Sequence, residues 1–209
     1  NGAMQVFSKF SIPQHLRAPT HALGATQIIG WGTTMYAPAI LASPIVADTG
    51  WARTDVFAAF SASLVISALL ARPAGRLIDR MGGRAALAAG SGLTALGLAL
   101  AALAPTLPVY FAAWAVLGVA MRLMLYEAAF ATLAAAGGND ARRAISVLTL
   151  YGGLASTVFW LAGFELIAAF GWRATFAVYA ALNLFVCLPL HAFFLPASAS
   201  AGLSDELDA

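Results

Sequence analysis

Three residues of one apolar stretch, Arg122, Tyr126 and Glu127, have the side chains best suited to chemistry in this chain. They lie within residues 108–136, where charged groups at membrane depth are costly and usually face a protein interior or water. A guanidinium in such a place can hold a carboxylate through two parallel hydrogen bonds, and a nearby phenol adds a third donor. Arg122 with Tyr126 is therefore a candidate site for an organic anion.

Glu127 offers a different chemistry, because a carboxylate at membrane depth can take up and release a proton. On a continuous helix, five residues turn by about 140° and rise about 7.5 Å, so Arg122 and Glu127 would point to different faces. Tyr126 would project close to Arg122. The sequence predicts no ion pair on a shared face. The alternatives are structural: another helix neutralises Arg122, and Glu127 is a permanent partner of an arginine or of backbone donors.

The elements that must position these groups are membrane helices. The chain has 209 residues, of which 61% are hydrophobic and 10% charged, and this is too apolar for one soluble core. Its apolar residues form stretches long enough for helices of about 20 residues, without the alternation of barrel strands. We predict an all-α polytopic membrane protein with six transmembrane helices in three antiparallel hairpins, over 22–47, 55–75, 85–104, 108–136, 144–169 and 173–195.

Basic residues predict the orientation of this bundle, with both termini cytoplasmic in a bacterial inner membrane. Residues 1–21 are then a cytoplasmic N-terminal segment, 22–195 the bundle, and 196–209 the start of a cytoplasmic linker or tail. Because topology explains the arginines, the net charge of +2 gives no reason to expect nucleic acid as a partner. The cytoplasmic side carries Lys9, Arg17, Arg72, Arg76, Arg80, Arg84, Arg142 and Arg143, and the outer side Arg53 and Arg173.

The connection between the second and third stretches has a distinctive pattern, GRLIDRMGGR over residues 75–84, and we expect a tight turn there. It resembles the loop between the second and third helices of major facilitator superfamily transporters, roughly G-x-L-x-D-R-x-G-R-[KR]. Gly83 stands where the family has a basic residue, so one positive contact of the loop is absent. GWR at 171–173 resembles the family's start of helix six. The matching loop positions are Gly75, Leu77, Asp79, Arg80, Gly82 and Arg84.

The resemblance runs from about Thr26 to Pro196 and implies one six-helix half of a twelve-helix transporter, in a lipid bilayer. Family helices one, two, four and five line the cavity, and the family's loop aspartate helps to hold the cytoplasmic gate against a helix end of the opposite half. We therefore expect substrate binding by Arg122, Tyr126, Trp31, Gln27 and Trp160, proton coupling by Glu127, and gating by Gly75, Asp79, Arg80, Gly82 and Arg84.

A second six-helix half is the implied partner, as a separate chain, a missing segment or a symmetric copy. We favour a separate or missing half over a symmetric copy, because the small, polar and acidic residues after Pro196 resemble an interrupted linker.

The expected function is secondary active transport, by alternating access, of a small solute such as a monocarboxylate. One alternative is proton-driven efflux of drugs or metalloids, in which a neutral or cationic cargo contacts Glu127. Another is a six-helix scaffold or sensor that moves no solute. The sequence has no metal-binding or nucleophilic motif, so we expect neither an enzyme nor a cofactor, and we place His15, His21 and His191 near the membrane interface.

Overall fold

The structure, a computed structural model, describes residues 12–196, and within that range it consists of helices and short connections, with no strand. The all-α prediction is confirmed there, and the six predicted apolar stretches are mostly helical, although 22–47 is divided at Met35 and Tyr36, 55–75 at Leu70 and 108–136 at Leu125. The elements are α2 (Gln14–Thr34), α3 (Ala37–Thr49), α4 (Arg53–Leu69), α5 (Ala71–Met81), α6 (Gly83–Leu103), α7 (Leu107–Met124), α8 (Tyr126–Gly137), the 3₁₀ turn η1 (Gly138–Asp140), α9 (Ala141–Leu182), the π-helical turn η2 (Asn183–Cys187) and α10 (Leu188–Phe194).

The predicted boundaries at the two ends of the bundle differ from the structure or lie outside the described residues. Helix α2 begins at Gln14, earlier than residue 22, because a helix continues beyond the apolar part of its sequence. The predicted linker after Pro196 lies outside the described residues, as does most of the predicted segment ahead of α2.

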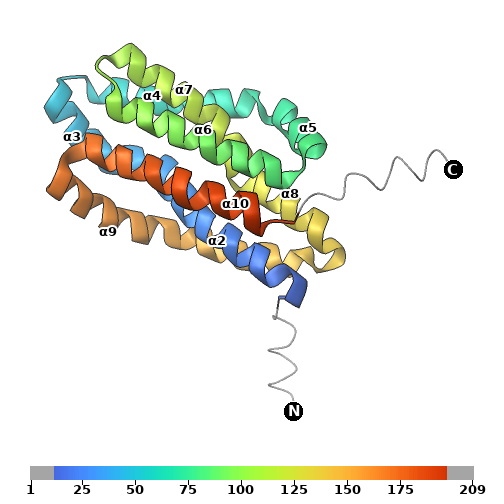
Figure 1. The fold of residues 1–209 in the computed structure, drawn as a ribbon. Coiled ribbons are helices and arrows are strands. Elements are labelled where there is room, and N and C mark those ends of the chain that lie inside the picture. Colours follow the sequence, from blue (N-terminus) through green and yellow to red (C-terminus); the bar gives the residue numbers. More distant parts are fainter. Residues whose placement is uncertain (1–11, 197–209) are drawn as a thin grey trace.

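The helices form an elongated bundle (Figure 1). Helix α2 packs along α9, and α7 packs against both α4 and α6. Two helical stretches, Gly83–Leu103 and Leu107–Phe194, are long and apolar enough to cross a membrane, and α4 with α5 would form a third if that bent pair is one span. The second stretch reverses direction within its length (Figure 1). The count of six crossings remains a prediction.

Large apolar side chains lie on the outside of this bundle. Leu69, Leu103 and Phe193 are each about three-quarters exposed, at 76%, 76% and 77%. Phe185 and Phe170 are exposed to nearly the same degree. Apolar surface of this kind is stable against lipid rather than water, in agreement with the predicted membrane location.

A single proline, Pro73, accounts for the bend in the second predicted stretch. Helices α4 and α5 meet at Leu70 with an angle of 60°. Pro73 lacks the amide that would bond to Leu69, and its ring crowds that carbonyl. The prediction of a turn over 75–84 is therefore mostly wrong, because Gly75 to Met81 belong to helix α5. Only Gly82 leaves the helical conformation before α6 begins.

Two chain reversals depend on glycine. Gly82 has φ 80° and ψ 152°, and Gly171 has φ 77° and ψ 173°. This backbone region is essentially closed to residues with a Cβ atom. The backbone conformation at position 82 therefore requires the glycine that the motif has there. Gly171 lets the chain reverse inside α9.

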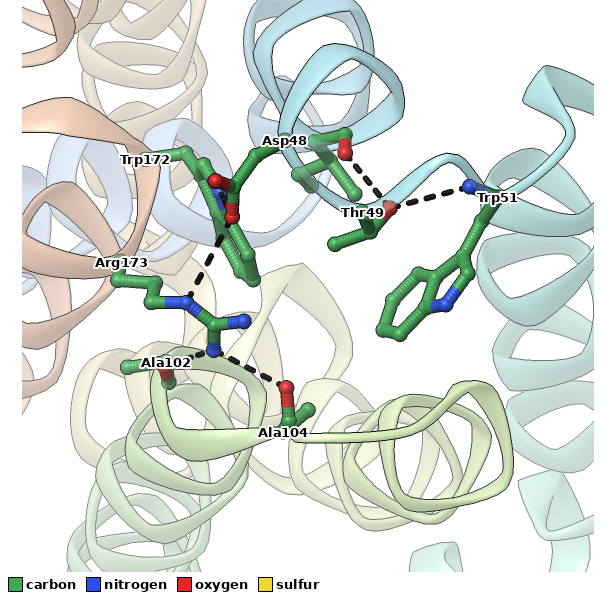
Figure 2. A network of polar contacts seen from close by, with 8 residues as sticks. Asp48, Thr49, Trp51, Ala102, Ala104, Trp172 and Arg173 are labelled. Atoms are coloured by element: carbon green, nitrogen blue, oxygen red, sulfur yellow. Dashed lines mark hydrogen bonds and ion pairs between the residues drawn. The ribbon is translucent and has the colours of Figure 1, made fainter.

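One end of the bundle is tied by the polar network in Figure 2. The Trp172 indole donates to Asp48 Oδ2 at 3.0 Å, and Arg173 Nε lies 3.9 Å from the same oxygen. Arg173 Nη1 also donates to the carbonyls of Ala102 and Ala104, at 3.1 and 3.0 Å, where α6 ends. A cation is favourable at the C-terminal end of a helix. The GWR segment therefore joins the ends of α3 and α6 to the second part of α9.

His191, which we expect near the membrane interface, lies inside the bundle and not on its surface. It is fully buried, with Nδ1 2.7 Å from Ser91 Oγ of α6 and Nε2 2.8 Å from Thr26 Oγ1 of α2. The side chain lies in the bundle because two hydroxyl groups on neighbouring helices satisfy both ring nitrogens. Hydropathy alone treats histidine as polar and places it at the membrane surface.

Gly171→Ala tests the reversal. No atom lies within 4 Å of the position that its Cβ would occupy, so the change introduces backbone strain without a steric clash. We expect a loss of about 1–3 kcal/mol in unfolding free energy, measured by thermal unfolding in detergent. The matched control is Gly75→Ala, also in open space but helical, which should be neutral or stabilise by up to about 1 kcal/mol. Equal effects of the two changes would contradict this account.

Candidate functional site

The centre of the site is an interruption in the fourth predicted stretch. Leu125 has φ −81° and ψ −162°, an extended conformation that separates α7 from α8. We predicted a continuous run over 108–136, and this is wrong at Leu125. The sequence around it contains neither proline nor an adjacent glycine, so the local residues give no signal of a break.

Neighbouring helices approach closely at this point. A Cβ atom on Gly30 of α2 would lie 2.7 Å from Met124 Cε, and one on Gly90 of α6 would lie 2.9 Å from the Leu123 carbonyl carbon. These glycines allow α2 and α6 to contact the end of α7 at the break.

Gln27 of α2 satisfies the backbone at the break. Its Nε2 donates to the Met124 carbonyl at 2.8 Å, and its Oε1 accepts from Trp31 Nε1 at 3.1 Å. Gln27 and Met124 are fully buried. Both ends of the amide are thus engaged with protein.

Arg122 and Glu127 form an ion pair across the break, with Arg122 Nη1 2.5 Å from Glu127 Oε1. The prediction that they do not share a face is wrong, because it assumed a continuous helix. Arg122 lies in the last turn of α7 and Glu127 in the first turn of α8, and each charge is favourable at its helix end. The side chains are 23% and 54% exposed, so the pair is within reach of a solute.

The predicted gating segment lies beside this pair. A pocket of about 100 Å³ is lined by Asp79 and Gly75 of α5 together with Arg122 and Glu127. Asp79 also lines a larger cavity of about 770 Å³, which reaches His15 on α2 and the end of α10. Neither pocket includes Arg80 or Arg84, two further gating candidates.

Gly83, which departs from the motif, has a packing role. A Cβ atom there would overlap Thr132 Oγ1 of α8. The basic residue usual in the family would have no room at this close approach of α6 and α8. The departure is visible in the sequence, but its reason is a contact with a distant helix.

Tyr126 packs between two aromatic rings. Its ring is stacked on Phe130 at 4.9 Å and lies 4.9 Å from the Trp31 ring of α2. Its hydroxyl lies 3.4 Å from the Thr149 carbonyl of α9, directly over Gly152. Tyr126 and Trp31, predicted to share a site, are therefore adjacent.

Trp160 stands apart from this group. Its ring partner is Phe164 of the same helix, with centroids 5.7 Å apart, and its side chain faces outward. Within residues 12–196, no three His, Cys, Asp or Glu side chains gather as they would for a metal ion.

The family model described as Major Facilitator Superfamily matches residues 22–206, most of the chain. No curated protein matches the sequence. The match covers the motif at 75–84, the helix break and the GWR segment.

Adjacent glycines on α9 test the seating of Tyr126. A Cβ at position 152 would overlap the tyrosine hydroxyl, whereas one at 153 meets no atom within 4 Å. We expect Gly152→Ala to lower the unfolding free energy by about 1–3 kcal/mol, because the phenol must move. Gly153→Ala, the control, should be neutral or stabilise by up to about 1 kcal/mol. The measurement is thermal unfolding in detergent, and a Gly152→Ala protein as stable as Gly153→Ala would refute this packing.

Proposed function

Since the chain belongs to the major facilitator superfamily of secondary transporters, we propose that it takes part in moving a small organic anion across the membrane together with a proton. The proposed solute class is a monocarboxylate. The observation that carries this proposal is the Arg122–Glu127 ion pair, which places an anion-binding group and a proton-binding group in direct contact.

Arg122 supplies the binding chemistry. Its guanidinium has five N–H donors, and the contact with Glu127 is through Nη1. A solute carboxylate that replaced Glu127 would form two parallel hydrogen bonds with the same group. The Glu127 side chain is about half exposed, and ion pairs of this kind contribute only about 0–1 kcal/mol. Replacing the Glu127 carboxylate by a solute carboxylate therefore costs little free energy at this site.

Glu127 supplies the coupling. Its carboxylate and the solute compete for Arg122, so uptake of a proton by Glu127 removes its charge and frees the guanidinium. The solute brings one negative charge and the proton one positive charge, and the total charge of the site is unchanged. Anion and proton thus bind together, as co-transport requires.

The position of Asp79 suggests how solute binding at Arg122 affects the proposed gating segment. Because Asp79 and Gly75 line the same small pocket as the ion pair, a change at Arg122 alters the electrostatic field at α5. We propose that Gly75, Asp79, Arg80, Gly82 and Arg84 act in gating, at the end of the bundle that faces the cytoplasm in this proposal.

Binding of a monocarboxylate to the purified protein in nanodiscs, measured by calorimetry, tests the proposal. Binding should strengthen from mildly alkaline to mildly acid pH, since proton and anion bind together. Arg122→Gln should weaken binding roughly 100-fold, or about 3 kcal/mol, because the charged hydrogen bonds are lost. Glu127→Gln should bind tightly at both pH values, since its neutral amide leaves Arg122 free.

Arg53→Gln is the matched control, because Arg53 is an exposed arginine whose guanidinium bonds only to Ser43 among the described residues. It should bind as the unchanged protein does. Unaltered binding by Arg122→Gln would sink the anion proposal. Binding of a neutral or cationic compound lost in Glu127→Gln would favour efflux instead.

A second six-helix unit is the proposed partner, because the exposed ion pair needs an opposite wall to enclose a solute. We expect one chain per particle when this protein is purified alone in detergent. Light scattering corrected for bound detergent measures this, and a stable two-chain particle would replace the separate partner by a symmetric copy.

A further inference from the structure

The ion pair at the candidate site exists only because the helix is interrupted. On a continuous helix, Arg122 and Glu127 would be separated by about 140° around the axis. In the structure their charged atoms are in contact at 2.5 Å. The interaction that stabilises the helix break at Leu125 is therefore what brings Arg122 and Glu127 together.

The interruption removes the helical donors of the last carbonyls of α7, those of Arg122, Leu123 and Met124, and the Met124 carbonyl gains a side-chain donor instead. In a continuous helix the Met124 carbonyl would accept from the Ala128 amide. Here the ladder holds on each side, with Leu125 N bonded to the Met121 carbonyl and Ala129 N bonded to the Leu125 carbonyl, at 3.0 and 3.2 Å. The Met124 carbonyl instead accepts from Gln27 Nε2. A buried carbonyl without a donor is strongly unfavourable in an apolar bundle, so this bond stabilises the break.

The amide of Gln27 is itself oriented. The Trp31 indole N–H can only donate, so it binds the oxygen end of the amide and turns the nitrogen end toward Met124. Trp31 also packs against the ring of Tyr126, the first residue of α8. Helix α2 thus contacts both sides of the break through two residues one turn apart.

We propose that Gln27 is a positioning residue: by binding the Met124 carbonyl it holds the break at Leu125 and so brings Glu127 to Arg122. Gln27 then acts through the backbone and not as a ligand of the solute. Its complete burial and the engagement of both amide ends support this role. The consequence for transport rests on the function proposed above, whereas the effect on the ion pair does not.

A mutant cycle in thermal unfolding tests the proposal without any solute. Arg122→Gln, Glu127→Gln and the double variant give the coupling between the two side chains, measured by circular dichroism at neutral pH and low salt. The cycle is repeated with Gln27→Met, which keeps a similar length and removes the donor. We expect a favourable coupling in the unchanged background and its loss in the Gln27→Met background.

Thr26→Val provides the matched control. Thr26 is buried on the same helix and bonds to His191, away from the break. The coupling should persist in this background. A coupling that survives Gln27→Met would overturn the proposal, as would its absence from the unchanged protein or its loss in Thr26→Val.

Whether the Gln27 variants fold distinguishes a role at the break from a role in the whole bundle. If Gln27→Met does not fold, the cycle is repeated with Gln27→Leu, which is shorter and also lacks the donor. Failure of both to fold, with Thr26→Val folded, would overturn the specific role and make Gln27 a residue on which the whole bundle depends. Because no transport is measured, failure of the proposed function cannot be mistaken for failure of this inference.

Discussion

Backbone polar groups freed inside an apolar bundle must find partners, and the geometry of the candidate site depends on how one such group is satisfied. The break at Leu125 leaves the Met124 carbonyl without its helical donor, and Gln27 supplies another. The break in turn places a cation at the end of α7 and an anion at the start of α8. In our proposal, the contact between the two charges therefore depends on the hydrogen bond from Gln27 to the Met124 carbonyl.

Helix α2 has a central place in the bundle for the same reason. Its Thr26 bonds to His191, and its Thr33 accepts from Asn183 Nδ2 at 3.0 Å. Each hydroxyl also bonds to a carbonyl of α2, so neither polar group depends on one partner. On the same helix, Gly24 and Gly32 let the rings of Tyr151 and Phe159 of α9 approach the backbone. Polar ties and close packing together fix α2 against the helices that carry the site.

The ends of the bundle differ in construction. At the GWR end, Arg173 and Trp172 join three segments through Asp48 and backbone carbonyls. At the motif end, α5 is bent from α4 and borders the two pockets that contain Asp79. The gate that we propose would lie beside the bent helix α5, and the hydrogen-bonded connection lies at the opposite end.

The sequence by itself determined the helical class and the apolar stretches, because these follow from composition, and its motif at 75–84 indicated the family and the glycine at one reversal. It also selected Arg122, Glu127, Tyr126 and Trp31, since charged and aromatic groups stand out in apolar runs. Only the tertiary structure decided that Arg122 meets Glu127, that His191 is buried, and that Gly83 must lack a side chain. Those outcomes depend on contacts between distant segments, such as Gln27 with Met124, 97 residues apart, and no local pattern encodes them.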